Sequence, residues 1–148
     1  MPSTHLSLHF HLVFSTKSRL PLIDASLRAP LHSFVSAVIQ RLQGVPESIG
    51  GTADHIHILA GLRATHRLSD FVREVKSESS KWMHEVKGVP EFMWQDGYGA
   101  FTVSASQRET VSDYIRDQEA HHKASGYESE YRTLLDKSGV VYDDRFLW

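Results

Sequence analysis

Cysteine is absent from the chain, and this absence removes three classes of function at once. Without a thiol there is no disulfide framework, no thiolate zinc site and no cysteine nucleophile. The lack of cysteine also fits a reducing compartment, because disulfides persist mainly in oxidising ones. Any chemistry must therefore come from other side chains.

Long apolar runs are missing too. No stretch of 18 apolar residues occurs, which argues against a membrane-spanning helix. His5, His9 and His11 interrupt the apolar residues near the N-terminus, so no secretory signal is recognised there. We therefore expect a cytoplasmic protein.

The chain also lacks an excess of either charge. It has 16 Lys and Arg against 18 Asp and Glu, a formal net charge of −2. Such a balance argues against a protein that coats nucleic acid by bulk attraction. Histidine, in contrast, is abundant: ten residues, about three times an average composition. The 148 residues suffice for one hydrophobic core, and we predict a single domain over residues 1–148.

The spacing of apolar residues predicts an ordered set of strands and helices. Residues 5–15 alternate between apolar and polar side chains, which is typical of a half-buried strand. Apolar residues at helical spacing follow Asp24, a candidate N-cap, and end at Gly44. A second helical stripe begins near Ser69. The later predicted elements are strands at 48–52 and 55–62, a bent strand or hairpin at 94–104, and helices at 106–124 and 127–137.

Ser106 and Glu109 have the spacing of a capping box, which predicts that the third helix begins at Ser106. The element order is β-α-β-β-α-β followed by further helices. This order predicts an α+β fold, a ferredoxin-like sandwich with one antiparallel sheet, two helices on one face and additional C-terminal helices. Many functions share this fold, so the site must decide the function.

The sharpest local motif is His55-Ile56-His57, which follows Asp54. Alternation along a strand points both imidazoles to one face, close enough to share a metal ion. Two ligands are too few for a strong site, so a third must come from elsewhere. The alternative is a pair of half-exposed polar residues on the outer sheet face. The pair at His9 and His11 has the same spacing.

The third predicted helix offers further polar groups on one stripe. At 100° per residue, Tyr114, Gln118, His121 and His122 lie within about 100° of one another. A helix stripe that faces the core is normally apolar, whereas this stripe is polar. Each of these four residues, taken alone, could still be an ordinary helix residue. A tyrosine phenol can attack phosphorus, and a metal on His55, His57 and Gln118 would polarise the phosphate. The set therefore favours phosphodiester transfer.

Basic residues suggest where nucleic acid would bind. Arg73 and Lys76 share one face of the second helix with several serines, opposite its apolar stripe. An ordinary solvated face is an equally good interpretation of these positions. Lys17 and Arg19 follow the first strand, and a strand end adjoins any site on the sheet. We predict that these four residues contact nucleic acid.

Four ordered motifs together resemble the single-tyrosine HUH transposases. They are His55-Ile56-His57 after an Asp, Lys17 after the first strand, the segment from Trp94 to Ser104, and the pattern formed by Tyr114, Gln118, His121 and His122. The resemblance is greatest to the group that moves insertion sequences as single strands and to its relatives associated with repeated extragenic palindromes. It covers nearly the whole chain, from His11 to Trp148.

The resemblance implies a mechanism and partners. His55, His57 and Gln118 would hold Mg²⁺ or Mn²⁺, and Tyr114 would cleave single-stranded DNA beside a hairpin through a 5′-phosphotyrosine intermediate. Members of the group are dimers in which the tyrosine helix of one subunit can complete the metal site of the other. Their cells are of bacterial or archaeal type.

Two other interpretations remain open from the sequence. The first is a non-catalytic hairpin-binding protein of the same fold. The second is a histidine-rich metal-binding protein without a DNA partner, which composition alone favours.

Overall fold

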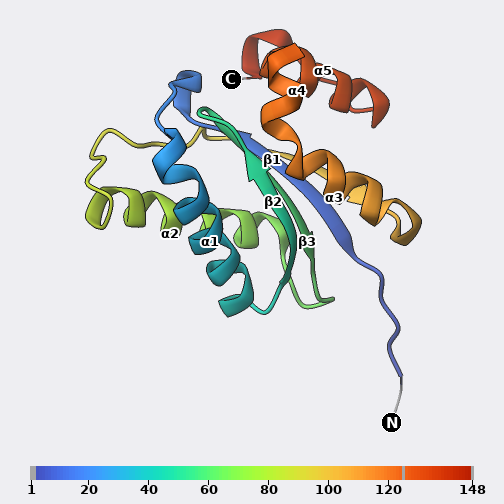
Figure 1. The fold of residues 1–148 in the computed structure, drawn as a ribbon. Coiled ribbons are helices and arrows are strands. Elements are labelled where there is room, and N and C mark those ends of the chain that lie inside the picture. The colour runs from blue at the N-terminus through green and yellow to red at the C-terminus, as the bar shows by residue number, and fades with distance from the viewer. Residues whose placement is uncertain (1–2, 125, 148) are drawn as a thin grey trace.

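A computed structural model describes residues 3–124 and 126–147. Residues 1–2, 125 and 148, which the single-domain prediction includes, lie outside the described residues. Within the described part, four antiparallel strands form one sheet in the order β2-β3-β1-β4 (Figure 1). This order confirms the predicted α+β, ferredoxin-like arrangement with additional C-terminal helices.

The elements have the following bounds. The strands are β1 (His9–Ser15), β2 (Val45–Gly51), β3 (His55–Gly61) and β4 (Gly99–Val103). The helices are α1 (Ala25–Arg41), α2 (Leu68–Glu85), α3 (Arg108–Arg116), α4 (Gln118–Ala124) and α5 (Tyr127–Lys137). Short 3-10 turns occur at η1 (Lys17–Arg19), η2 (Ala105–Gln107) and η3 (Asp144–Phe146). Among the described residues, no helix has both the length and the hydropathy needed to cross a membrane.

The sheet is covered on both faces (Figure 1). On one face, alternate residues of β1 and β3 pack with α1 and α2 into the main core, which includes Leu12, Phe14, Ile56, Ile58 and Ala60. On the other face, two smaller clusters join the sheet to α3 and α5. One contains Leu59 and Ile115, and the other contains Val13, Tyr127 and Tyr131.

Coverage of the second face changes the environment of β3. The interpretation of the histidine pair as half-exposed residues on an outer face is wrong, because His55 and His57 are both 0% exposed. A strand that is covered on both faces has no side that faces water, so its polar side chains are buried as well. The two imidazoles must therefore be satisfied by protein groups or by a bound ion.

Several predicted boundaries differ from those of the structure. Asp24 caps α1 as predicted, and its carboxylate accepts from the backbone N–H groups of Ser26 and Leu27. At the other end of α1, the left-handed residue is Gln43 rather than Gly44. The helix α2 begins at Leu68, and β1 begins at His9 rather than at residue 5.

The predicted helix at 106–124 is split in two. The capping-box prediction is wrong, because Ser106 lies in η2, α3 begins at Arg108, and its N-cap makes no side-chain hydrogen bond. Asp117 then leaves helical geometry, with φ −95° and ψ 22°, before α4 begins. In Figure 1, α4 turns away from the axis of α3. This turn decides where Gln118 points.

The segment predicted as one bent strand or a hairpin at 94–104 is a continuous strand only in its second half. Trp94 forms an isolated bridge with Thr16, and β4 begins only at Gly99. The residues between them form a loop that packs along α2, where the Lys76 Nζ donates to the carbonyl oxygens of Gln95 and Gly97. These bonds to the loop carbonyls hold residues 96–98 along α2, outside the sheet.

Gly50 sets how closely α3 approaches the sheet. A Cβ at Gly50 would overlap the backbone carbonyl of Ile115, the neighbour of Tyr114. We expect Gly50→Ala to lower the free energy of unfolding by about 2 to 3 kcal/mol, because a buried overlap forces the backbone to shift. Urea denaturation measures the change.

Gly97→Ala is the matched control for this substitution. Its added Cβ would meet only the Gln95 side-chain nitrogen, at 3.8 Å. We expect the control to change stability by less than about 0.5 kcal/mol. Equal stability of the two variants would show that α3 is not held against Gly50.

Candidate active site

His55 and His57 project from β3 toward the face covered by α3, α4 and α5. The pairing of β1 with β3 places Ser15 opposite His55 and Val13 opposite His57. Residues opposite each other in an antiparallel pair share a face. The two ring centroids lie 5.1 Å apart. The strand thus brings both imidazoles to one point beneath the C-terminal helices, as the sequence predicted.

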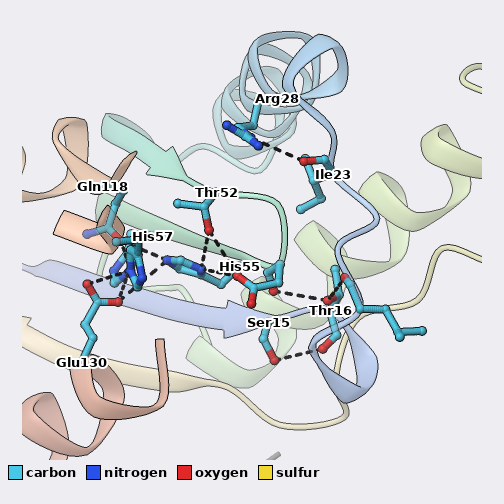
Figure 2. Close-up of polar contacts among 12 residues, drawn as sticks. Ser15, Thr16, Ile23, Arg28, Thr52, His55, His57, Gln118 and Glu130 are labelled. Atoms are coloured by element: carbon cyan, nitrogen blue, oxygen red, sulfur yellow. Dashed lines mark hydrogen bonds and ion pairs between the residues drawn. The ribbon is translucent and has the colours of Figure 1, made fainter. Parts of the chain in front are cut away.

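Short polar contacts fix the ring of His55 (Figure 2). Its Nδ1 lies 2.8 Å from Asp54 Oδ1 and 3.0 Å from Thr52 Oγ1. A neutral imidazole has one N–H, which the Asp54 carboxylate attracts to Nδ1. The lone pair of Nε2 is then directed toward the side-chain oxygen of Gln118, at 2.9 Å.

His57 also lies between two polar partners. Its Nδ1 is 2.7 Å from His11 Nε2, and its Nε2 is 2.9 Å from Glu130 Oε1. Burial lowers the pKa of His57 to about 4, although the hydrogen bond to Glu130 opposes this shift. The ring is therefore neutral at pH 7, and its one N–H is donated either to His11 or to Glu130.

The helix α4 supplies two more groups. Gln118 is 1% exposed, and its Nε2 donates to the Tyr114 carbonyl oxygen at 3.4 Å, which turns Oε1 toward the histidines. His122 Nε2 lies 3.1 Å from the same Oε1. Gln118 reaches His55 because it begins a new helix directly after the break at Asp117.

Glu130 of α5 lies at the centre of these groups, and its side chain is 7% exposed. Oε1 faces His57, and Oε2 lies 3.3 Å from His122 Nε2 and accepts a hydrogen bond from the Tyr114 hydroxyl. Burial would raise the pKa of the Glu130 carboxyl, but the bonds from His122, His57 and Tyr114 outweigh it. They hold this pKa well below its usual range, so the carboxylate is ionised.

Tyr114 projects from α3 into the same cluster. Its ring centroid is 5.8 Å from that of His57 and 4.7 Å from that of His121. Burial, together with the hydrogen bond and charge of Glu130, raises the pKa of the phenol above its ordinary value. The phenol is thus protonated in this arrangement and needs help to become a nucleophile.

The donor set fits a divalent cation. Ligand atoms of His55, His122 and Glu130 all lie within 4.8 Å of one another. Neighbouring ligands of an octahedral ion with bonds of about 2.1 Å are about 3 Å apart, which matches the contacts of His55, His57 and Gln118 with their partners. His55 Nε2 and the Gln118 oxygen lie 2.9 Å apart, so one cation could bind both as neighbouring ligands.

Comparison with known proteins decides the family. Residues 4–118 match the profile of the family described as "Transposase IS200 like". The chain belongs to the IS200-like transposase family. No curated protein matches the chain in sequence.

Two solved structures resemble this IS200-like chain in fold. One is described as a candidate transposase from Deinococcus radiodurans R1, with 21% identity, a TM-score of 0.63, and coverage of 80% of this chain and 96% of that one. The other is a REP-associated tyrosine transposase bound to a REP hairpin, with 12% identity, a TM-score of 0.57, and coverage of 78% and 70%.

The IS200-like chain brings together the residues that the sequence singled out for chemistry. His55, His57, Gln118 and Tyr114 meet at one place. His121 packs on the Tyr114 ring and is exposed, outside the cluster of donor atoms.

Three further members of the cluster are His11, His122 and Glu130. His11 and His122 were named from the sequence without a role, Glu130 was not named, and the structure places both histidines beside predicted ligands. Glu130 shares the buried stripe of α5 with Tyr127, Tyr131 and Leu135. A carboxylate at helical spacing among apolar residues was the signal that could have revealed it.

The four predicted DNA-contacting residues lie in two places. Lys17 is exposed in η1, and Arg19 beside it forms an ion pair with Glu128 of α5 at 2.6 Å. Arg73 and Lys76 line a groove of about 530 Å³ between α2 and the loop that contains Trp94. Burial lowers the pKa of Lys76 to about 8, and its ammonium is bonded to the loop carbonyls.

Proposed function

We propose that this IS200-like chain cleaves and rejoins single-stranded DNA next to hairpins, with Tyr114 as the nucleophile. The observation that carries this proposal is the convergence of a tyrosine hydroxyl, a carboxylate and three imidazoles at one buried place. Family membership supports a role in DNA transposition. The REP-associated relative was solved with a hairpin, which supports a folded single strand as substrate.

His55, His57 and Gln118 would hold Mg²⁺ or Mn²⁺, with Glu130 and His122 close enough to add ligands. A bound divalent ion supplies Lewis acidity, which polarises a phosphate oxygen and offsets the charge that develops on it. The chain's own groups orient the ligands: Asp54 holds the Nδ1–H of His55, and His11 can accept the Nδ1–H of His57.

The chemical step exchanges one phosphodiester bond for another. The Tyr114 oxygen forms a bond to phosphorus while the bond to the 3′ oxygen breaks, which leaves a 5′-phosphotyrosine and a free 3′ hydroxyl. The phenol proton is released to water, because the low pKa of the Glu130 carboxyl makes this carboxylate a weak base. The departing 3′ oxygen takes a proton from water. Attack by another 3′ hydroxyl reverses the step and rejoins DNA.

The tyrosine and the metal-binding groups meet within one chain in this structure. We also propose the homodimer that the family resemblance implies.

A covalent adduct tests the proposed function. The protein is incubated with Mn²⁺ and a single-stranded oligonucleotide that carries a hairpin, and the products are separated on a denaturing gel. We expect a protein band shifted by covalently attached DNA. Binding without an adduct would favour the non-catalytic hairpin-binding protein, and metal uptake without DNA binding would favour the metal-binding protein.

Lys17 gives a direct test of the predicted DNA contacts. We expect Lys17→Ala to weaken hairpin binding at every sequence and to reduce the slope of log K against log salt by about 0.7 to 0.9, the release expected for one phosphate contact. Fluorescence anisotropy over a salt series measures this slope. Lys81→Ala, at an exposed position of α2, is the control, and a slope unchanged in the Lys17 variant removes Lys17 from the interface.

A further inference from the structure

A pocket of about 390 Å³ opens between α3 and α5 beside the nucleophile. This volume is in the range of ordinary small-ligand sites, about 300 to 1,000 Å³. We name it the α3–α5 pocket. Its lining includes Thr110, Val111 and Tyr114 from the α3 side and Thr133, Leu134 and Lys137 from α5.

The position of the pocket makes it the approach to Tyr114. The histidines of β3 are fully buried, so a DNA strand cannot reach the hydroxyl from the sheet side. Tyr114 and Glu130, which are joined by a hydrogen bond, both line the pocket. A phosphate that Tyr114 attacks must come within about 3 to 3.5 Å of its oxygen. The neighbouring nucleotide must then occupy the adjacent space.

The chemistry of the walls suits a nucleotide. Val111 and Leu134 offer apolar surfaces for a flat base, and His121 is an exposed imidazole at the same pocket. Single-stranded bases bind proteins mainly by stacking on aromatic rings, which His121 and Tyr114 offer at this pocket. The hydroxyl groups of Ser129 and Thr110 can bond to a base edge, and the Lys137 ammonium can meet a phosphate.

Building on the cleavage function proposed above, we infer that the α3–α5 pocket binds the nucleotide next to the scissile phosphate and so presents that phosphate to Tyr114. The Glu130 carboxylate at the pocket repels a bare phosphate, because both are anionic. A divalent cation offsets this charge. Nucleotide affinity should therefore be higher with Mg²⁺ than without it.

Nuclear magnetic resonance of the full chain tests this site with the four deoxynucleoside 5′-monophosphates, each titrated with and without MgCl₂. We expect shift changes centred on residues 110–114 and 129–137. Thr110→Trp fills the pocket from an exposed position and should weaken binding on the order of tenfold, within the range of one lost stacking contact. Asp113→Trp, exposed on α3 and outside the pocket lining, is the matched control and should bind normally.

Three results would overturn the inference. They are shift changes centred elsewhere, equal affinity of the two tryptophan variants, and the same shifts with inorganic phosphate alone, which would show that no base is bound. A mononucleotide has no diester to cleave, so this test is independent of the adduct assay. Pocket binding without an adduct would support the pocket and contradict the proposed cleavage, whereas an adduct without pocket binding would overturn the pocket alone.

Discussion

Replacing Tyr114 by phenylalanine is expected to abolish the covalent DNA adduct. Phenylalanine fills the same space but lacks the oxygen that would attack phosphorus. The hydroxyl donates only to the ionised Glu130 carboxylate among the contacts described, so its loss should lower the free energy of unfolding by about 1.5 to 3 kcal/mol. The measurement is the denaturing-gel assay with Mn²⁺ and a hairpin oligonucleotide, run beside a thermal melt of the same protein.

Two controls make the Tyr114 result specific. Tyr98→Phe removes a phenol oxygen from the groove beside α2, where Tyr98 packs on the main core and therefore on the other face of the sheet from the histidines, and should leave the adduct intact. Hairpin binding by Tyr114→Phe should also survive, because the phenol oxygen is not needed for phosphate contacts by Lys17. An adduct of full yield in Tyr114→Phe would show that another group is the nucleophile.

Loss of the histidine ligands should have the second large effect, on metal affinity. We expect His55→Asn and His57→Asn to weaken Mn²⁺ binding by about 100-fold or more, since even groups that only orient ligands contribute about 10- to 100-fold. Isothermal titration calorimetry of the DNA-free protein measures this affinity without reference to cleavage. His5→Asn, at an exposed position, is the control and should bind Mn²⁺ normally.

Glu130→Gln distinguishes the carboxylate from the amide and imidazole ligands. The substitution keeps the size of the side chain but removes its charge, so it should weaken Mn²⁺ binding. Glu128→Gln on the same helix removes a charge that faces Arg19 and should not. Unchanged Mn²⁺ affinity in His55→Asn, His57→Asn and Glu130→Gln would contradict the proposed metal site.

The strand order and the two-layer core could be predicted from local patterns in the sequence. The alternation in β1 and β3 marked which residues face α1 and α2, and Asp24 marked the start of α1. Alternation has a limit, however. It gives two faces but does not say what covers the second face, and α3 to α5 bury His55 and His57 completely.

The candidate site could be predicted only in part for a related reason. Tyr114 and Gln118 were found on one stripe of an assumed continuous helix, yet the helix breaks at Asp117, and tertiary contacts rather than helical periodicity bring Gln118 to His55. Glu130 is distant from β3 in sequence, and no spacing rule links it to His57. Such a contact depends on how α5 packs across the sheet.

Lys76 shows that a basic residue opposite the apolar stripe of a helix can have a structural role. It was predicted to face DNA because it lies opposite the apolar stripe of α2. In the fold its ammonium bonds to the loop carbonyls of Gln95 and Gly97 and lies 5.2 Å from the ring centroid of Phe14. The Lys76 side chain thus stabilises the fold of the loop, and its contact with DNA stays a prediction.

Mapping the covalent bond shows directly whether Tyr114 is the nucleophile. The adduct formed with Mn²⁺ and a hairpin oligonucleotide is digested with nuclease and protease, and the peptide that carries the remaining nucleotide is sequenced by mass spectrometry. We expect a nucleotide 5′-phosphate on the oxygen of Tyr114. Attachment to any other residue, or a cleaved oligonucleotide with no protein-linked nucleotide, would contradict it.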